Sequence, residues 1–186
     1  RISPNDIFQH LSEIAEKESI EYEVQALKLI AKRSNGGMRD AQSLLEQLHL
    51  LPEGITIKNI QNLLGEVSEI ELTNLIKSLV ENNPESLIIT CNKLYDAGNE
   101  PLQIIIGLLN ITRDLLLHTS NNKYSDLYYT SDEFQDELDK ISKRINKSTI
   151  IKWHNNLKNI EYQIKTSDNP RLWFEIHLTS LLDQEI

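Results

Sequence analysis

The sequence predicts an all-α protein. Only 5 prolines and 6 glycines interrupt its 186 residues, which leaves room for long helices. Apolar residues recur three and four positions apart along most of the chain, as on one face of a helix, and no alternating strand pattern of useful length occurs. Hydrophobic residues make up 39% and charged residues 25%, as in an ordinary soluble protein of one or two domains.

Residues 1–54 are predicted to form a three-helix bundle. Ser3 can cap the first helix, and Pro4 suits its first position. The helices are expected over about residues 4–17, 21–33 and 37–50. Pro52-Glu53-Gly54 ends the third helix, which places the boundary to the next domain near residues 52–57.

Residues 55–186 are predicted to form a larger helical bundle. Its helices are expected over about residues 57–64, 69–82, 84–97, 101–118, 134–145, 149–164 and 170–182. Ser68 and Glu71 are predicted to form a capping box, and Ser148 is predicted to cap a later helix. The last helix carries a stripe formed by Leu172, Trp173, Ile176, Thr179 and Leu182. Residues 119–132 are predicted to be a loop, whose role the sequence leaves open.

Charge and cysteine content exclude several classes of function. The net charge of −9 disfavours nonspecific binding of nucleic acid, because phosphates are neutralised by clustered Lys and Arg. The single cysteine, Cys91, cannot form an internal disulfide and fits a reducing cytoplasm, the expected location.

No apolar run reaches the ~20 residues that span a bilayer, so no membrane partner is expected. Because the chain begins with Arg1 and shows no signal-peptide pattern, we expect it to be a piece of a longer protein.

No complete catalytic or metal-binding motif is found in the sequence. It contains no phosphate loop, no dinucleotide fingerprint, and no His or Cys pair at metal-ligand spacing. The five histidines are single residues on predicted helices: His10, His49, His118, His154 and His177. We therefore expect no catalytic residue and no metal site in this chain.

One segment, residues 35–41, does indicate chemistry. Gly36 and Gly37 allow a sharp turn and a close approach of the backbone, and they leave the N–H groups of the next helix unobstructed. Arg39 lies in the first turn of that helix, where the helix dipole disfavours a cation. A guanidinium beside free N–H groups can bind phosphate oxygens. The alternative is a glycine-rich turn whose Arg39 pairs with Asp40 or another acid, and spacing alone leaves both interpretations open.

Several stretches resemble a known family. Residues 35–47, NGGMRDAQSLLEQ, are similar to the sensor-2 segment of the gamma/tau subunits of bacterial DNA polymerase III, which are AAA+ ATPases of the clamp loader. Residues 7–31 resemble the lid of that family. The LLG at residues 63–65 and the PRLWFE at residues 170–175 resemble its collar domain. The resemblance covers nearly the whole chain.

The resemblance implies a role for each part of the chain. Residues 1–54 would be the three-helix AAA+ lid, and residues 55–186 the helical collar through which subunits oligomerise. Arg39 would contact the terminal phosphates of ATP held by the same subunit, and Met38 would pack near the nucleotide. Gln42 and Glu46 depart from the Leu and Asp that are usual in the family.

The resemblance also implies cofactors and partners for the full-length protein. That protein would be a subunit of a DNA-directed DNA polymerase, with ATPase activity, that binds ATP and Mg²⁺. The family's phosphate loop, magnesium-binding motif and zinc-binding cysteines precede this segment, so this chain alone is expected to bind none of these groups and to be inactive. Expected partners are other gamma/tau copies, delta and delta-prime, with the sliding clamp and primed DNA reached through the whole complex.

Two alternative functions stay open at this point. One is a helical module that binds a partner protein and senses no nucleotide. The other is the lid of a different AAA+ protein, such as an archaeal-type clamp-loader small subunit or a helicase loader, although those show a different run of residues around the arginine.

Overall fold

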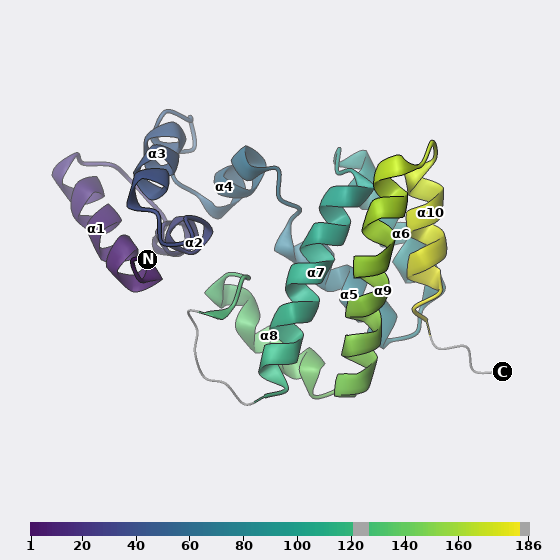
Figure 1. Cartoon of the computed structure of the whole chain (residues 1–186). Helices are drawn as coiled ribbons and strands as arrows, with labels where there is room; N and C mark the ends of the chain where they lie inside the picture. The colour runs from purple at the N-terminus through teal and green to yellow at the C-terminus, as the bar shows by residue number, and fades with distance from the viewer. Residues whose placement is uncertain (121–126, 183–186) are drawn as a thin grey trace. The chain divides into compact units, whose positions relative to one another are not determined.

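The computed structural model describes residues 1–120 and 127–182, and these residues form a helical protein (Figure 1). Their only β pairing is an isolated parallel bridge between Tyr22 and Ile55. The predicted all-α class is confirmed. No helix among the described residues is long and apolar enough to cross a membrane.

The chain folds into two compact units. Unit 1 contains residues 1–66 and the segment 127–132, and unit 2 contains residues 67–120 and 133–182. The chain therefore leaves unit 1 after Glu66 and returns to it with the segment 127–132. From the turn Pro52-Glu53-Gly54 the sequence predicts the domain boundary near residues 52–57, and that boundary stays a prediction.

Unit 1 is built from four helices around one apolar core. They are α1 (Pro4–Lys17), α2 (Val24–Arg33), α3 (Met38–His49) and α4 (Ile57–Leu64). The first three helices agree with the predicted bundle, except that α2 starts at Val24 and the sequence predicts its start at about residue 21. The buried side chains Ile7, Leu27 and Leu48 come from α1, α2 and α3 and are packed in a single cluster with Ile60 of α4. The amphipathic stripes read from the sequence therefore meet as expected.

Backbone contacts join the start of α2 to the start of α4. The N–H of Glu23 donates to the carbonyl of Ile55 at 3.0 Å, and the N–H of Ile57 donates to the Glu23 carboxylate at 3.1 Å. Ile55 also forms the isolated parallel bridge with Tyr22.

Arg33, the last residue of α2, is the centre of a polar network in unit 1. Its side chain is 7% exposed, and its Nε and Nη2 donate to the two carboxylate oxygens of Glu66 at 2.6 and 2.9 Å. Its Nη1 donates to the carbonyl of Tyr129 at 2.7 Å, and the guanidinium lies 3.4 Å from the centroid of the Tyr129 ring. The Tyr129 hydroxyl donates to Glu66 at 2.8 Å. We call these three residues the Arg33 network, which combines a bidentate ion pair with a cation–π contact.

A second set of contacts holds the segment 127–132 to α2. Lys28 and Lys32 donate to the two carboxylate oxygens of Asp132 at 3.2 and 3.0 Å, and Lys32 also donates to the carbonyl of Thr130 at 3.1 Å. Burial raises the pKa of Asp132, but the hydrogen bonds and charges of Lys32 and Lys28 outweigh it, and the pKa lies below its ordinary value. The basic residues Lys28 and Lys32 of α2 are thus used in binding this segment. The rest of the predicted loop at residues 121–126 lies outside the described residues.

Unit 2 is a larger bundle around its own core. Its helices are α5 (Glu69–Val80), α6 (Pro84–Asp96), α7 (Pro101–His118), α8 (Gln135–Ser142), α9 (Lys147–Thr166) and α10 (Pro170–Thr179), with the short 3₁₀ helix η2 (Asp132–Phe134) before α8. The long helices α7 and α9 run side by side (Figure 1). Trp153 of α9 is buried and donates its indole N–H to the carbonyl of Leu181 at 3.2 Å, which closes the end of the chain against the bundle.

Two of the predicted helix caps are wrong. Ser68 lies at the N-cap of α5, but its side chain makes no capping hydrogen bond, and the first turn is instead favoured by the charges of Glu69 and Glu71 near the positive helix end. Ser148 lies inside α9, because the backbone is already helical from Lys147 and the N-cap is Asn146. The cap at Ser3 forms as predicted, and Thr56 caps α4 by accepting from the N–H of Asn59.

Three residues of the stripe predicted on the last helix do not face the core, whereas Leu182 of the same stripe packs against it. Leu172, Trp173 and Ile176 are 49%, 39% and 45% exposed, while Phe174 and Leu178 of the same helix are fully buried. Helix α10 is apolar on more than one side, and the periodicity alone could not show which side packs inward. The exposed residues Leu172, Trp173 and Ile176 are called the α10 face below.

Arg33→Ala is expected to lower the free energy of unfolding of unit 1 by about 2–4 kcal/mol, because it leaves the largely buried Glu66 carboxylate unpaired. Both tryptophans, Trp153 and Trp173, belong to unit 2, so their fluorescence does not report on unit 1. Hydrogen exchange measured by mass spectrometry on peptides from residues 1–66 and 127–132 gives the change directly.

The matched control is Lys165→Ala, which removes an ion pair with Glu161 whose lysine is half exposed. This exposed pair should contribute less than about 0.5 kcal/mol. Equal exchange protection of unit 1 in Arg33→Ala and in the wild type would contradict the importance of the Arg33 network.

Candidate phosphate-binding site

The turn between α2 and α3 is held by local hydrogen bonds. Ser34 is buried, and its hydroxyl donates to the carbonyl of Ile30 at 2.6 Å. The N–H of Gly37 donates to the carbonyl of Ser34 at 2.8 Å, which closes the turn. Asn35 and Gly36 both have positive φ, +49° and +83°, a conformation that Asn and Gly adopt most readily.

Gly36 also allows a close approach of the N-terminal residues. The N–H of Ile2 donates to the carbonyl of Gly36 at 3.4 Å. A Cβ at Gly36 would lie 2.9 Å from the Cβ of Arg1 and 3.1 Å from the carbonyl oxygen of Ile2. A side chain at this position would therefore displace residues 1–2 from the turn.

Helix α3 begins with an open N-terminus. Its N-cap residue, Gly37, has no side chain, and the N–H groups of Met38, Arg39 and Asp40 have no acceptor among the described residues. The Asp40 carboxylate lies over Gly37, because a Cβ on that glycine would overlap it. A negative charge at this point compensates the positive end of the helix dipole. The same property would let an added anion bind there.

Arg39 is exposed and forms no hydrogen bond or ion pair with any residue that the structure describes. The alternative interpretation required a pair with Asp40 or another acid of the chain, and no such pair is present in the described part. Met38 is partly buried and packs against the core of unit 1. The four predicted site residues Gly36, Gly37, Met38 and Arg39 thus lie together in one turn, with the arginine directed to solvent.

The sequence missed a contact that involves Gln42. The Nε2 of Gln42 lies 3.1 Å from the Nε2 of His10, so the amide joins α3 to α1. This pair gives a structural reason for an amide at a position where the family usually has an apolar residue. Residue type alone could not have shown it, because the two positions lie 32 residues apart.

Other groups with possible chemistry are engaged in the fold. The Nδ1 of His154 lies 2.9 Å from the hydroxyl of Thr112, and an imidazole nitrogen of His177 lies 3.0 Å from the amide oxygen of Gln163. Burial, together with Glu175, raises the pKa of Cys91 to about 12, so this residue is an unreactive thiol at neutral pH. Within residues 1–120 and 127–182, no three His, Cys, Asp or Glu residues are grouped as metal ligands would be.

Gly36→Ala is expected to destabilise unit 1 by about 1–2 kcal/mol for the positive φ alone, with a further loss from the contact with Arg1 and Ile2. Gly98 is the matched control, because it has a φ of +86° and open space around the site of a Cβ. Gly98→Ala should show only the cost of the backbone conformation. Thermal unfolding of both variants, followed by circular dichroism, measures the difference. A smaller loss in Gly36→Ala than in Gly98→Ala would exclude the proposed packing of residues 1–2.

Comparison with protein families covers both parts of the chain. The model described as the ATPase lid domain of the DNA polymerase III clamp loader subunit matches residues 6–48. The model of domain III of the DNA polymerase III subunits gamma and tau matches residues 55–184.

Curated relatives agree with these matches. DNA polymerase III subunit tau of Bacillus subtilis is 26% identical over 97% of the chain and 32% of its own length. DNA polymerase III subunit gamma of Buchnera aphidicola from Acyrthosiphon pisum is 27% identical over 97% of the chain and 50% of its own length. The plant protein STICHEL of Arabidopsis thaliana is 30% identical over 69% of the chain and 11% of its own length. The chain therefore spans half or less of the length of these relatives.

A solved structure shows the same fold. The DNA clamp loader delta protein of Bacillus subtilis aligns with 98% of the chain and 57% of its own length, with a TM-score of 0.52 and 16% identity. At this identity the likeness concerns the fold alone. Because the domain III model by itself covers more than half of the chain, the chain belongs to the gamma/tau subunit family of DNA polymerase III clamp loaders, of which it comprises the ATPase lid and domain III.

Proposed function

We propose that this chain couples the nucleotide state of a clamp-loader subunit to loading of the sliding clamp on primed DNA. In the complete subunit the ATPase core would bind ATP and Mg²⁺, and unit 1 would close over the nucleotide. The domain III part of the chain would hold the subunit in its complex. The chain itself would supply the sensor and the assembly surface, and no catalytic group.

The observation that carries the proposal is the free guanidinium of Arg39. An arginine in the first turn of a helix is unfavourable with the helix dipole, and here its guanidinium forms no ion pair with an acid of the described residues. The N–H groups at the start of α3 are also open. A phosphate placed at this point would accept from both the guanidinium and the backbone, which is the arrangement that a terminal phosphate of ATP requires.

For assembly, we propose that the α10 face binds neighbouring subunits, namely other gamma/tau copies, delta and delta-prime. Its three residues are about half exposed and lie at i, i+1 and i+4, so they share one side of the helix. The guanidinium of Arg171 lies 4.6 Å from the centroid of the Tyr95 ring and holds α10 against α6. A rigid helix with exposed aromatic and aliphatic side chains is suited to a permanent interface.

We also propose a cytoplasmic location for this protein. The single thiol supports it, because Cys91 is buried and free. A protein of the replication machinery with one reduced cysteine fits a reducing compartment.

Arg39→Ala in the full-length subunit, assembled with its partners, is expected to reduce ATP-dependent clamp loading by at least about tenfold, the effect of losing one hydrogen bond to a charged group. The free energy of unfolding should change by less than about 0.5 kcal/mol, because the side chain is exposed. Clamp loading on primed DNA and the dissociation constant for ATP are the two measurements.

The matched control is Arg144→Ala, which removes another exposed arginine, from the turn after α8. It should leave clamp loading unchanged. Unchanged loading in Arg39→Ala would favour the alternative function, a helical interaction module that senses no nucleotide.

Leu172→Asp with Ile176→Asp is expected to weaken assembly of the complex by at least about tenfold, because charges then enter a desolvated apolar contact. Sedimentation velocity of the reconstituted subunits measures the loss. Ile70→Asp, which changes a 59% exposed residue of α5, is the control and should have little effect. An equal loss in Ile70→Asp would show that the α10 face is not the specific contact.

A further inference from the structure

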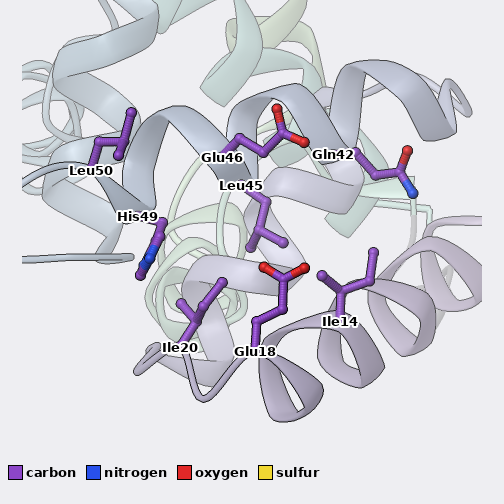
Figure 2. A pocket seen from close by; sticks show the side chains of 8 residues that line it. All are labelled: Ile14, Glu18, Ile20, Gln42, Leu45, Glu46, His49 and Leu50. Atoms are coloured by element: carbon purple, nitrogen blue, oxygen red, sulfur yellow. The ribbon is translucent and has the colours of Figure 1, made fainter.

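A pocket of about 410 Å³ opens on unit 1 at the C-terminal ends of α1 and α3. Figure 2 shows Ile14, Glu18 and Ile20 on one side and Leu45 opposite them. Gln42, Glu46, His49 and Leu50 complete the lining. This pocket, called the lid pocket below, extends along α3 from Gln42 to Leu50, and none of residues 35–41 of the candidate phosphate site lines it.

The inner wall of the lid pocket is apolar and rigid. Leu45 and Ile20 are 2% and 7% exposed and belong to the core of unit 1. Ile20 is fixed by the end of α1, where its N–H donates to the carbonyl of Ala15 at 2.8 Å after Ser19 adopts a φ of +55°. Such a helix ending turns the following apolar residue back onto the helix. The inner wall of the pocket is therefore formed by residues of the folded core, from α3 and from the connection between α1 and α2.

The charged lining of the lid pocket is acidic. Glu18 and Glu46 are exposed, and neither carboxylate has a hydrogen bond or ion pair with a described residue. No Lys or Arg lines the pocket, and its remaining titratable residue is His49. Glu18 is the C-cap of α1, and Leu50 is the C-cap of α3, so the negative ends of two helix dipoles lie at the same place. The field in the pocket therefore favours a cation.

An exposed apolar residue extends the pocket to the surface. Leu50 is 83% exposed, the largest exposure of any leucine in the described chain, and Leu51 beside it is 38% exposed. A soluble protein leaves such residues exposed singly without consequence, but here they adjoin an apolar pocket. A pocket that receives an apolar anchor, with an apolar edge and charges at the rim, is the usual form of an interaction hot spot.

We propose that the lid pocket binds a protein segment that presents one large apolar side chain next to Lys or Arg. The apolar side chain would fill the space between Ile14, Ile20 and Leu45. The adjacent cation would pair with Glu18 or Glu46, and a second apolar side chain would cover Leu50. Charge complementarity identifies the partner, because a cationic segment gains from two unpaired carboxylates and two helix ends, whereas an acidic or neutral segment does not.

The test begins with a display library of short random peptides, selected on the 186-residue chain. The enriched peptides are expected to contain a large apolar residue beside Lys or Arg. Synthetic versions are then measured by fluorescence anisotropy on the wild type and on Glu18→Lys/Glu46→Lys. The double charge reversal should weaken binding by at least about tenfold, and added salt should weaken binding to the wild type.

The matched control is Glu13→Lys/Glu16→Lys, which makes the same charge change at two exposed residues of α1 outside the pocket. It should change binding by less than about twofold, because exposed charges beyond the pocket are screened. Leu50→Ser should weaken binding about fivefold through the lost apolar contact. Circular dichroism confirms that the variants are folded.

Four outcomes would overturn the proposal. They are the absence of apolar–basic peptides among those enriched, binding that is unaffected by Glu18→Lys/Glu46→Lys, an equal loss in the control variant, and self-association of the chain through the lid pocket. Binding of a small amphiphilic cation, such as phenethylamine, as tightly as the peptides would show a small-molecule site instead.

Discussion

The position of the candidate phosphate site depends on the Arg33 network. Arg33 ends α2, and the turn that starts α3 follows within four residues. The bidentate pair with Glu66 and the contact with Tyr129 restrain the end of α2 from two separate parts of the chain. Because a largely buried guanidinium must keep its partners, this arrangement is costly to break. The turn at Asn35–Gly37 is therefore built on a rigid base.

Two arginines six residues apart have opposite roles in unit 1. Arg33 is largely buried and its donors are used within the fold, whereas Arg39 is exposed and has no acceptor in the described chain. The contacts of Arg33 stabilise unit 1. Arg39 forms no contact in the described chain that would stabilise it. A residue that is unfavourable with the helix dipole and unpaired is a residue available to a ligand. This contrast is the main physical support for the proposed sensor function of Arg39.

The two units offer surfaces of different chemistry. The α10 face of unit 2 is apolar and lies on a rigid helix, as a permanent interface requires. The lid pocket of unit 1 is apolar inside and acidic at its rim, which suits a partner held by one anchor and steered by charge. The first surface belongs to the proposed assembly function, and the second goes beyond it. The two surfaces can be tested independently, because their residues do not overlap.

The sequence by itself determined the helices, most of their ends and the turn at residues 35–37. These features depend on contacts within about four residues, such as the caps at Ser3 and Thr56 and the positive φ at Gly36. The resemblance carried by residues 35–47 also predicted the family. Only the tertiary structure decided which side of α10 is buried and that residues 127–132 bind α2. It also showed that Arg39 has no partner among the described residues and that a pocket opens beside Leu45. The contacts behind these features join residues about 30 to 100 positions apart, and their geometry follows from packing, which no local pattern encodes.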